Sequence, residues 1–71
     1  MKNYANLLKN EREQRNISQE KLAKNIGISQ AQISYYESGT NIPSIDIIEK
    51  LADYYGITVD ELIGHEVKKN W

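Results

Sequence analysis

The chain has 71 residues, no cysteine, and nine lysines and arginines against ten aspartates and glutamates, for a net charge of -1. That length allows one domain with one core, and the lack of cysteine excludes disulfides and thiolate metal sites. The Met-Lys-Asn-Tyr start has no signal-peptide-like apolar run, and no stretch approaches the roughly 20 apolar residues of a membrane span, so we expect a cytoplasmic protein without membrane contact.

The first predicted helix covers residues 3–15. Its core-facing stripe, at helical spacing, is formed by Tyr4, Leu7, Leu8 and Glu11. A carboxylate on that stripe needs either exposure or a partner. Asn16 follows and can adopt the left-handed conformation that ends a helix.

Two short helices are predicted over residues 18–38, separated by a tight turn. Ser18 can cap the first helix with its hydroxyl, and Gly27 can end it in the left-handed conformation. Ser29 opens the second helix in an S-x-x-Q capping box with Gln32, and a glycine ends that helix as well. Two helices joined in this way are typical of proteins that place a helix in the DNA major groove.

The second of these helices divides into an apolar face and a polar face. Ile33 and Tyr36 share the apolar face, which can pack on Leu22, Ala23 and Ile26 of the helix before it. The polar face carries no charge and is formed by Gln30, Ala31, Gln32, Ser34 and Tyr35. Such a surface is unusual for a merely solvated face and favours contact with another molecule.

Two further helices follow in the last third of the chain. The fourth predicted helix follows Pro43, begins at Ser44 and ends at Gly56, and the fifth opens with a capping box of Thr58 and Glu61. Their core-facing positions are Ile48, Leu51, Ala52, Tyr55, Val59 and Leu62. We therefore predict an all-α, compact five-helix domain.

The domain is predicted to cover residues 1–64, with the helix-turn-helix motif at 18–38 and a short C-terminal tail at 65–71. The chain resembles the helix-turn-helix domains of the phage repressor and Cro type, the Xre or Cro/C1-type family, from Leu8 to Leu62. The resemblance rests on Ser18-Gln19, Leu22-Ala23, Gly27, Ser29, Ile33, Glu37-x-Gly39, Pro43, Leu51-Ala52 and Gly56.

This resemblance implies a lambda repressor-like DNA-binding fold and a sequence-specific transcriptional regulator, expected to be a repressor. It implies a homodimer on a palindromic double-stranded operator, and a cytoplasmic protein of bacterial or phage origin that joins the nucleoid when bound. We expect no cofactor and no small-molecule substrate.

The resemblance also assigns the polar face to DNA bases. Gln30 matches a base-contacting position, and its amide can pair with adenine N6 and N7. Ala31 can touch a thymine methyl, Ser34 allows close approach, and Tyr35 can reach a phosphate or a sugar edge. Gln32 is either a base contact or the capping partner of its own helix. Each of these residues has the alternative of being plain surface.

Phosphate contacts are expected at both helix starts and in one loop. Gln19 matches a family position that binds a phosphate and braces the next helix, and Ser29 stands at a second helix start. Thr40 and Asn41 are expected to contact phosphate through the loop after the motif, by side chain and by main-chain N–H. Because these surfaces lack arginine and lysine, which read guanine most often, we predict an A·T-leaning operator.

Charge is unevenly distributed along the sequence. Up to residue 40 the chain has six cations and four anions, and from residue 41 it has three cations and six anions. The half with the helix-turn-helix motif is the more positive one, so electrostatics permit DNA binding without demanding it.

Two further groups of residues have predicted structural roles. Arg12 and Glu37 match a paired arginine and glutamate of the family; if the pair is partly buried, removing one partner should cost more than removing both. The candidates for the dimer interface are Val59, Ile63, Val67 and Trp71. The alternative is that Ile63 and Trp71 fold back on the core of their own chain.

An enzyme is not indicated by this sequence. The single histidine, His65, lies in a charged tail, and His65 with Glu66 offers too few ligands for a metal site. The alternative function is an antitoxin or regulatory interaction protein whose main partner is another protein, which the acidic last third favours.

Overall fold

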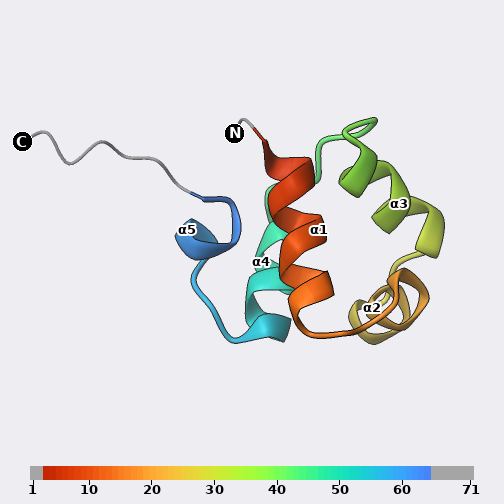
Figure 1. Cartoon of the computed structure of the whole chain (residues 1–71), viewed down its shortest axis with the longest axis horizontal. Coiled ribbons are helices and arrows are strands. Elements are labelled where there is room, and N and C mark those ends of the chain that lie inside the picture. Colours follow the sequence, from red (N-terminus) through yellow and green to blue (C-terminus); the bar gives the residue numbers. More distant parts are fainter. Residues whose placement is uncertain (1–2, 65–71) are drawn as a thin grey trace, which may run out of the picture.

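The computed structural model describes residues 3–64, and five helices with no strand make up that range. The helices are α1 (Tyr4–Gln14), α2 (Gln19–Ile26), α3 (Gln30–Ser38), α4 (Ile45–Tyr55) and α5 (Val59–Leu62). In Figure 1, α2 and α3 lie on one side of α1, and α5 lies on the other side. The predicted all-α, five-helix architecture is confirmed.

Four of the five helices in residues 3–64 begin at the capping residue that the sequence predicts. The hydroxyl of Ser18 accepts from the Lys21 N–H at 3.0 Å, and Ser44 and Thr58 cap α4 and α5 in the same way. Asn16 adopts the predicted left-handed conformation after α1, with φ of 57°. These bonds satisfy backbone groups that a helix end otherwise leaves unpaired.

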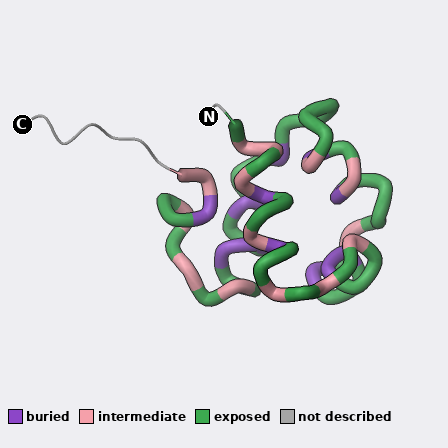
Figure 2. Tube along the Cα trace, viewed as in Figure 1, coloured by how far each residue is buried: buried purple, intermediate pink, exposed green. Residues whose placement is uncertain are grey.

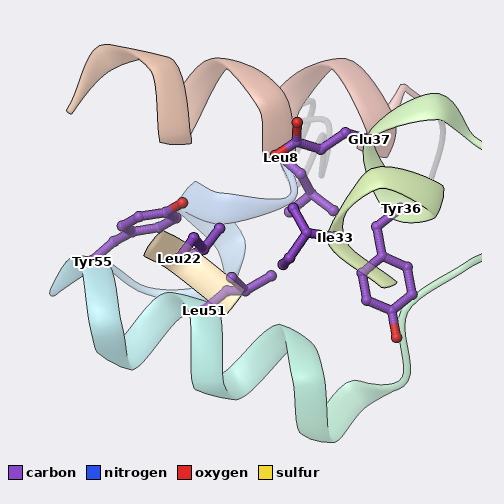
Figure 3. Close-up of a pocket in the computed structure, with 7 residues that line it drawn as sticks. All are labelled: Leu8, Leu22, Ile33, Tyr36, Glu37, Leu51 and Tyr55. Carbon is purple, nitrogen blue, oxygen red and sulfur yellow. The ribbon is translucent and has the colours of Figure 1, made fainter. Parts of the chain in front are cut away.

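The core is built from one apolar face of each helix, seen as purple segments turned toward the interior in Figure 2. Its largest fully buried side chains are Leu22, Ile33 and Leu62. Figure 3 shows side chains from α1, α3 and α4 meeting between those helices. The space left between them is about 10 Å³, so at most one water fits and a small-molecule ligand has no room.

Glu11, on the core-facing stripe of α1, has a charged partner. Its carboxylate lies 2.7 Å from the Arg15 guanidinium, one helical turn away. The side chains of both residues are partly exposed, so the pair contributes little to stability.

Tyr55 packs against the core at its predicted core-facing position. Its side chain is only half-buried, although its hydroxyl is enclosed and has no hydrogen-bond partner within residues 3–64. The Arg15 guanidinium lies 4.2 Å above its ring, and the Tyr54 ring packs edge-on at 5.4 Å. Burial raises the pKa of Tyr55 from 10.0 to about 12, and the nearby Arg15 charge opposes this shift.

The raised pKa of Tyr55 predicts a loss of stability at high pH. Below pH 10 the hydroxyl is protonated in both the folded and the unfolded state; between pH 10 and about 12 the unfolded state loses its proton first. The free energy of unfolding should therefore fall across this window by a larger amount than in Tyr55→Phe. Urea unfolding of both proteins at pH 9 and pH 11 measures the difference, and equal pH dependence would contradict the prediction.

Candidate nucleic-acid interface

The chain turns sharply between α2 and α3. Gly27 takes the left-handed conformation with φ of 81°, and the N–H groups of Gly27 and Ile28 both donate to the Ala23 carbonyl, at 2.9 and 3.0 Å. Ser29 then caps α3, so the two helices are joined by residues 27–29. Because Ala23 is small and buried, α2 and α3 pack closely, which completes the predicted helix-turn-helix.

One face of α3 is turned away from the rest of the molecule (Figure 1). Ile33 and Tyr36 are buried on its inner face, whereas Gln30, Ala31 and Tyr35 are exposed, the last by 48%. Ser34 is half-buried between them. At 100° per residue, Gln30, Ala31, Ser34, Tyr35 and Ser38 occupy one continuous outer side, which we call the α3 outer face. It carries hydrogen-bonding groups and no charge.

Gln32 is separated from the α3 outer face by its place on the helix and by its bonds. Its side-chain oxygen accepts from the Ser29 N–H at 3.0 Å and from the Ser29 hydroxyl at 3.3 Å. The reciprocal bond, from the Gln32 N–H to the Ser29 hydroxyl, measures 3.1 Å. The capping box is therefore formed, and only the amide NH₂ of Gln32 remains for another partner.

The start of α3 differs from the starts of the other capped helices. The first turns of α2, α4 and α5 contain acidic residues, which the helix dipole favours, but the first turn of α3 contains none. The N–H groups of Gln30 and Ala31 have no acceptor within residues 3–64. An anion approaching this end of α3 would meet two free donors and no repelling carboxylate.

The structure brings Arg12 and Glu37 together in a buried, two-pronged ion pair. The guanidinium Nε and Nη2 donate to the two carboxylate oxygens at 2.8 and 2.9 Å, and Nη1 donates to the Ile17 carbonyl at 2.7 Å. The two side chains are 11% and 5% exposed. The hydrogen bond to Glu37 raises the pKa of Arg12, so the guanidinium is held in its charged form.

Gln19 joins this ion pair from α2. Its amide Nε2 donates to a Glu37 oxygen at 3.1 Å, so that α1, α2 and α3 meet at a single carboxylate. The second amide N–H of Gln19 has no acceptor in the described part of the chain. The predicted bracing of the next helix is present, and one donor remains for a phosphate.

An open groove beside the α3 outer face contains two residues that sequence reasoning missed. Lys9, Gln19, Ser34, Glu37 and Ser38 line it. Lys9 places a cation beside the α3 outer face, which has no charge of its own. Ser38 has a visible sequence signal, since it follows Ser34 by four residues on the same helix face, but nothing in the sequence brings Lys9 of α1 next to α3.

The loop after α3 has fewer free donors than predicted. The N–H of Gly39 donates to the Tyr36 carbonyl, and those of Thr40 and Asn41 donate to the Tyr35 carbonyl. Ending α3 uses these N–H groups, and the phosphate contact predicted for this loop stays a prediction. The side chains remain, with the Thr40 hydroxyl 2.8 Å from that of Ser38.

The predicted dimer residues have limited free surface. Val59 and Ile63 are half-buried and pack against the core of their own chain, as the alternative for Ile63 anticipated. Val67 and Trp71 lie outside the described residues, as does His65. Two isoleucines elsewhere, Ile42 and Ile45, are far more exposed, and sequence reasoning missed them.

Other kinds of site are not indicated in the range 3–64. No helix there has the length and apolar character needed to cross a membrane. No group of three or more histidine, cysteine, aspartate or glutamate side chains is placed there to hold a metal ion.

Comparison with known proteins gives a consistent result. The sequence profile of the helix-turn-helix family matches residues 8–62, the range over which the resemblance was predicted. The cryptic phage CTXphi transcriptional repressor RstR of Vibrio cholerae is 33% identical over 61 residues, which are 86% of this chain and 55% of that protein. The HTH-type transcriptional regulator AnsR of Bacillus subtilis is 38% identical over 58 residues, 82% of this chain and 50% of that protein.

A third relative is similar to the present chain over nearly its whole length. It is an uncharacterized HTH-type transcriptional regulator of Methanocaldococcus jannaschii, 34% identical over 61 residues that are 86% of this chain and 92% of that protein. The chain spans about half the length of the other two relatives. No solved structure gives a significant match.

Proposed function

This chain belongs to the helix-turn-helix family of DNA-binding transcriptional regulators, and we propose that it is a sequence-specific repressor that inserts α3 into the major groove. The observation that supports this most directly is the α3 outer face. It is exposed, uncharged and rich in hydrogen-bonding groups, and it begins at a helix start with free N–H groups. A helix of this diameter fits the major groove, where base edges present donors and acceptors.

Base reading is assigned to four residues of this face. Gln30 pairs with adenine through its amide, and Ala31 packs on a thymine methyl. Ser34 and Tyr35 lie further along the same side and contact base or sugar edges. Gln32 has a smaller part, because its oxygen is held in the capping box. With no arginine or lysine on the face, the operator should lean toward A·T.

Phosphate contacts are assigned to residues at the edge of the α3 outer face. Gln19 donates its second amide N–H, and the N–H groups after Ser29 face the backbone at the start of α3. Lys9 adds a charge in the groove between α1 and α3. The side chains of Thr40 and Asn41 reach the backbone from the loop after α3. Few of these groups are cationic, so one copy alone should bind weakly.

We infer a homodimer from that weakness. A single α3 reads too few bases to select one site in a genome, whereas two copies related by a twofold axis read a palindrome with half-sites about one helical turn, roughly 34 Å, apart. The operator is therefore expected to be palindromic.

Selection of bound sites from a random duplex library at moderate salt tests the proposal. We expect enrichment of a twofold-symmetric, A·T-leaning site. Gln30→Ala should relax the preference at its contacted base pair and lose about 1–3 kcal/mol of discrimination there. Gln14→Ala is the matched control, because Gln14 is an exposed glutamine at the end of α1 and lies on the opposite side of that helix from Arg12, whose side chain contacts α3.

A separate prediction concerns the contribution of Lys9 to DNA affinity. Lys9→Gln should weaken binding about equally on all sequences, and the slope of log affinity against log salt should decrease in magnitude by about 1. Lys50→Gln, which removes an exposed lysine of α4, should leave the slope unchanged. Titrations of a fluorescent duplex at several salt concentrations measure both, and equal slopes for Lys9→Gln and the native chain would remove Lys9 from the interface.

The second candidate is an interaction protein of the same fold, such as an antitoxin. The exposed side chains of α4 and α5 favour it, because Asp46, Glu49, Asp53 and Glu61 outnumber Lys50 there. Such a surface suits a basic protein partner. Lack of any enriched site above non-specific binding would support this candidate and remove the DNA contacts assigned above.

A further inference from the structure

Two neighbouring isoleucines are the most exposed large apolar side chains in residues 3–64. Ile42 is 74% exposed and Ile45 is 63% exposed. Ile42 lies in the loop after α3 and Ile45 is the first residue of α4, so both belong to the connection that leaves the C-terminal end of α3 (Figure 1). Neither belongs to the core or packs against it, and adjacent exposed apolar residues commonly mark a contact surface.

The segment that carries them is held firmly. The Tyr4 hydroxyl donates to the Asn41 carbonyl at 3.0 Å, which ties the loop to α1. The N–H groups of Thr40 and Asn41 are bound to the end of α3, and Pro43 is buried. The two isoleucines are therefore presented in a fixed arrangement, which lowers the entropy lost when a partner binds.

We propose that Ile42 and Ile45 form the contact between two copies of this chain bound to adjacent half-sites; this rests on the proposed DNA-binding function. Residues 39–45 contain no charged residue, so two copies can meet through this segment without repulsion between its own side chains. The next exposed charges along the chain, Asp46 and Glu49, belong to α4 and lie beyond the segment. In a twofold contact each surface meets its own equivalent, and a neutral apolar surface suits that.

The position of the surface agrees with this pairing. The N-terminal end of α3 adjoins the turn from α2, whereas its C-terminal end leads into the isoleucine segment (Figure 1). A second copy bound to the same face of the DNA avoids α2 of the first copy if it lies beyond the C-terminal end of α3. The twofold axis then passes beside Ile42 and Ile45.

The size of the contact implies that pairing depends on DNA. Two isoleucine side chains cover only a small part of the roughly 800 Å² that each partner buries in a stable interface. The copies are therefore monomeric at ordinary concentrations in solution. Adjacent half-sites raise their effective concentration to about the millimolar range, at which a weak contact forms. Occupancy of the operator then rises cooperatively with protein concentration.

Cysteine cross-linking tests the contact, because the native chain has no cysteine. Ile42→Cys and Ile45→Cys are treated with a short bis-maleimide on two duplexes, the palindrome recovered by site selection and a duplex with one half-site. Val59→Cys is the control for an interface through α5. We expect cross-linked dimers at the isoleucine positions on the palindrome and few on the half-site duplex, with little product from Val59→Cys.

The opposite pattern overturns the contact. Cross-linking through Val59→Cys alone would move the interface to α5, and no product at the isoleucines while two copies occupy the palindrome would remove them from any interface. If no duplex is bound, the DNA-binding function fails by itself. Cross-linking at millimolar protein concentration without DNA then tests the isoleucine surface by itself. A cross-linked dimer would support a contact between two copies there, and no product would overturn it.

A second pair of measurements separates a copy-to-copy contact from a DNA contact. The double variant Ile42→Asn, Ile45→Asn should bind a single half-site within twofold of the native chain. Its affinity for the palindrome should fall at least tenfold, because the cooperative gain is lost. A matching loss on the half-site would mean that the isoleucines touch DNA, which would overturn the proposal.

Discussion

Glu37→Gln and Arg12→Met should each lower the free energy of unfolding by about 3–5 kcal/mol, whereas the double variant Arg12→Met, Glu37→Met should cost less than either. In a domain of this size the melting temperature falls by about 4–8 °C for each kcal/mol, so the single variants should melt at least 12 °C lower. Thermal unfolding followed by circular dichroism measures all three.

The reason lies in burial of the pair. The side chains of Arg12 and Glu37 are 11% and 5% exposed, so removing one charge leaves the other in a poorly solvated place without its partner. Glu37 also accepts from Gln19, and Arg12 donates to the Ile17 carbonyl, so each charge anchors a further group. Removing both charges removes the desolvation penalty together with the attraction.

The structure offers a matched control for this prediction. Glu11 and Arg15 form an ion pair with a similar separation of 2.7 Å, but their side chains are 31% (Arg15) and 21% (Glu11) exposed and lie on one helix. Glu11→Gln makes the same chemical change as Glu37→Gln and should cost no more than about 1 kcal/mol. If the two substitutions cost the same, burial of the Arg12–Glu37 pair has no special role.

This ion pair also concerns the surface that we propose binds DNA. Glu37 is on α3, Arg12 on α1 and Gln19 on α2, so one carboxylate fixes the orientation of α3 against two other helices. The α3 outer face begins beside Glu37 on the same short helix, because Ser34, Glu37 and Ser38 line one groove. The orientation of this face is therefore set partly by the Arg12–Glu37 ion pair.

Much of this fold is predictable because its signals are local. Ser18, Ser29, Ser44 and Thr58 each cap a helix, and each bond is made within three residues along the chain. The core positions follow from helical spacing in the same local way. Even the Arg12–Glu37 pair, which links α1 to α3, was accessible only because the family resemblance supplied what spacing does not.

The features that were missed depend on how distant segments pack. Lys9 belongs to the α3 groove only because α1 crosses α3 there. The N–H groups of Thr40 and Asn41 are used because α3 ends in a particular hydrogen-bonding pattern. Ile42 and Ile45 are apolar, and apolar residues are usually assigned to the core. Only the folded structure shows that these two side chains lie outside it.

Ala31→Glu should lower operator affinity about 100-fold while leaving the fold intact. Ala31 is exposed in the first turn of α3, where the helix dipole favours a carboxylate, so stability should be unchanged or slightly higher. On DNA the same carboxylate faces phosphates and base edges. At roughly 6 Å from one phosphate and an effective dielectric constant of about 20, the repulsion is about 3 kcal/mol, a loss of about 100-fold in affinity.

The control must add the same charge elsewhere. Gln14→Glu places a carboxylate at an exposed position at the end of α1, on the opposite side of that helix from Arg12 and its contact with α3, and changes the net charge of the chain by the same amount. Affinity for the selected palindrome should fall far less in this variant, because general repulsion is screened over a Debye length of about 8–10 Å. Equal losses in the two variants would mean that net charge, and not the α3 outer face, governs binding; native affinity in Ala31→Glu would move the DNA contact to another surface.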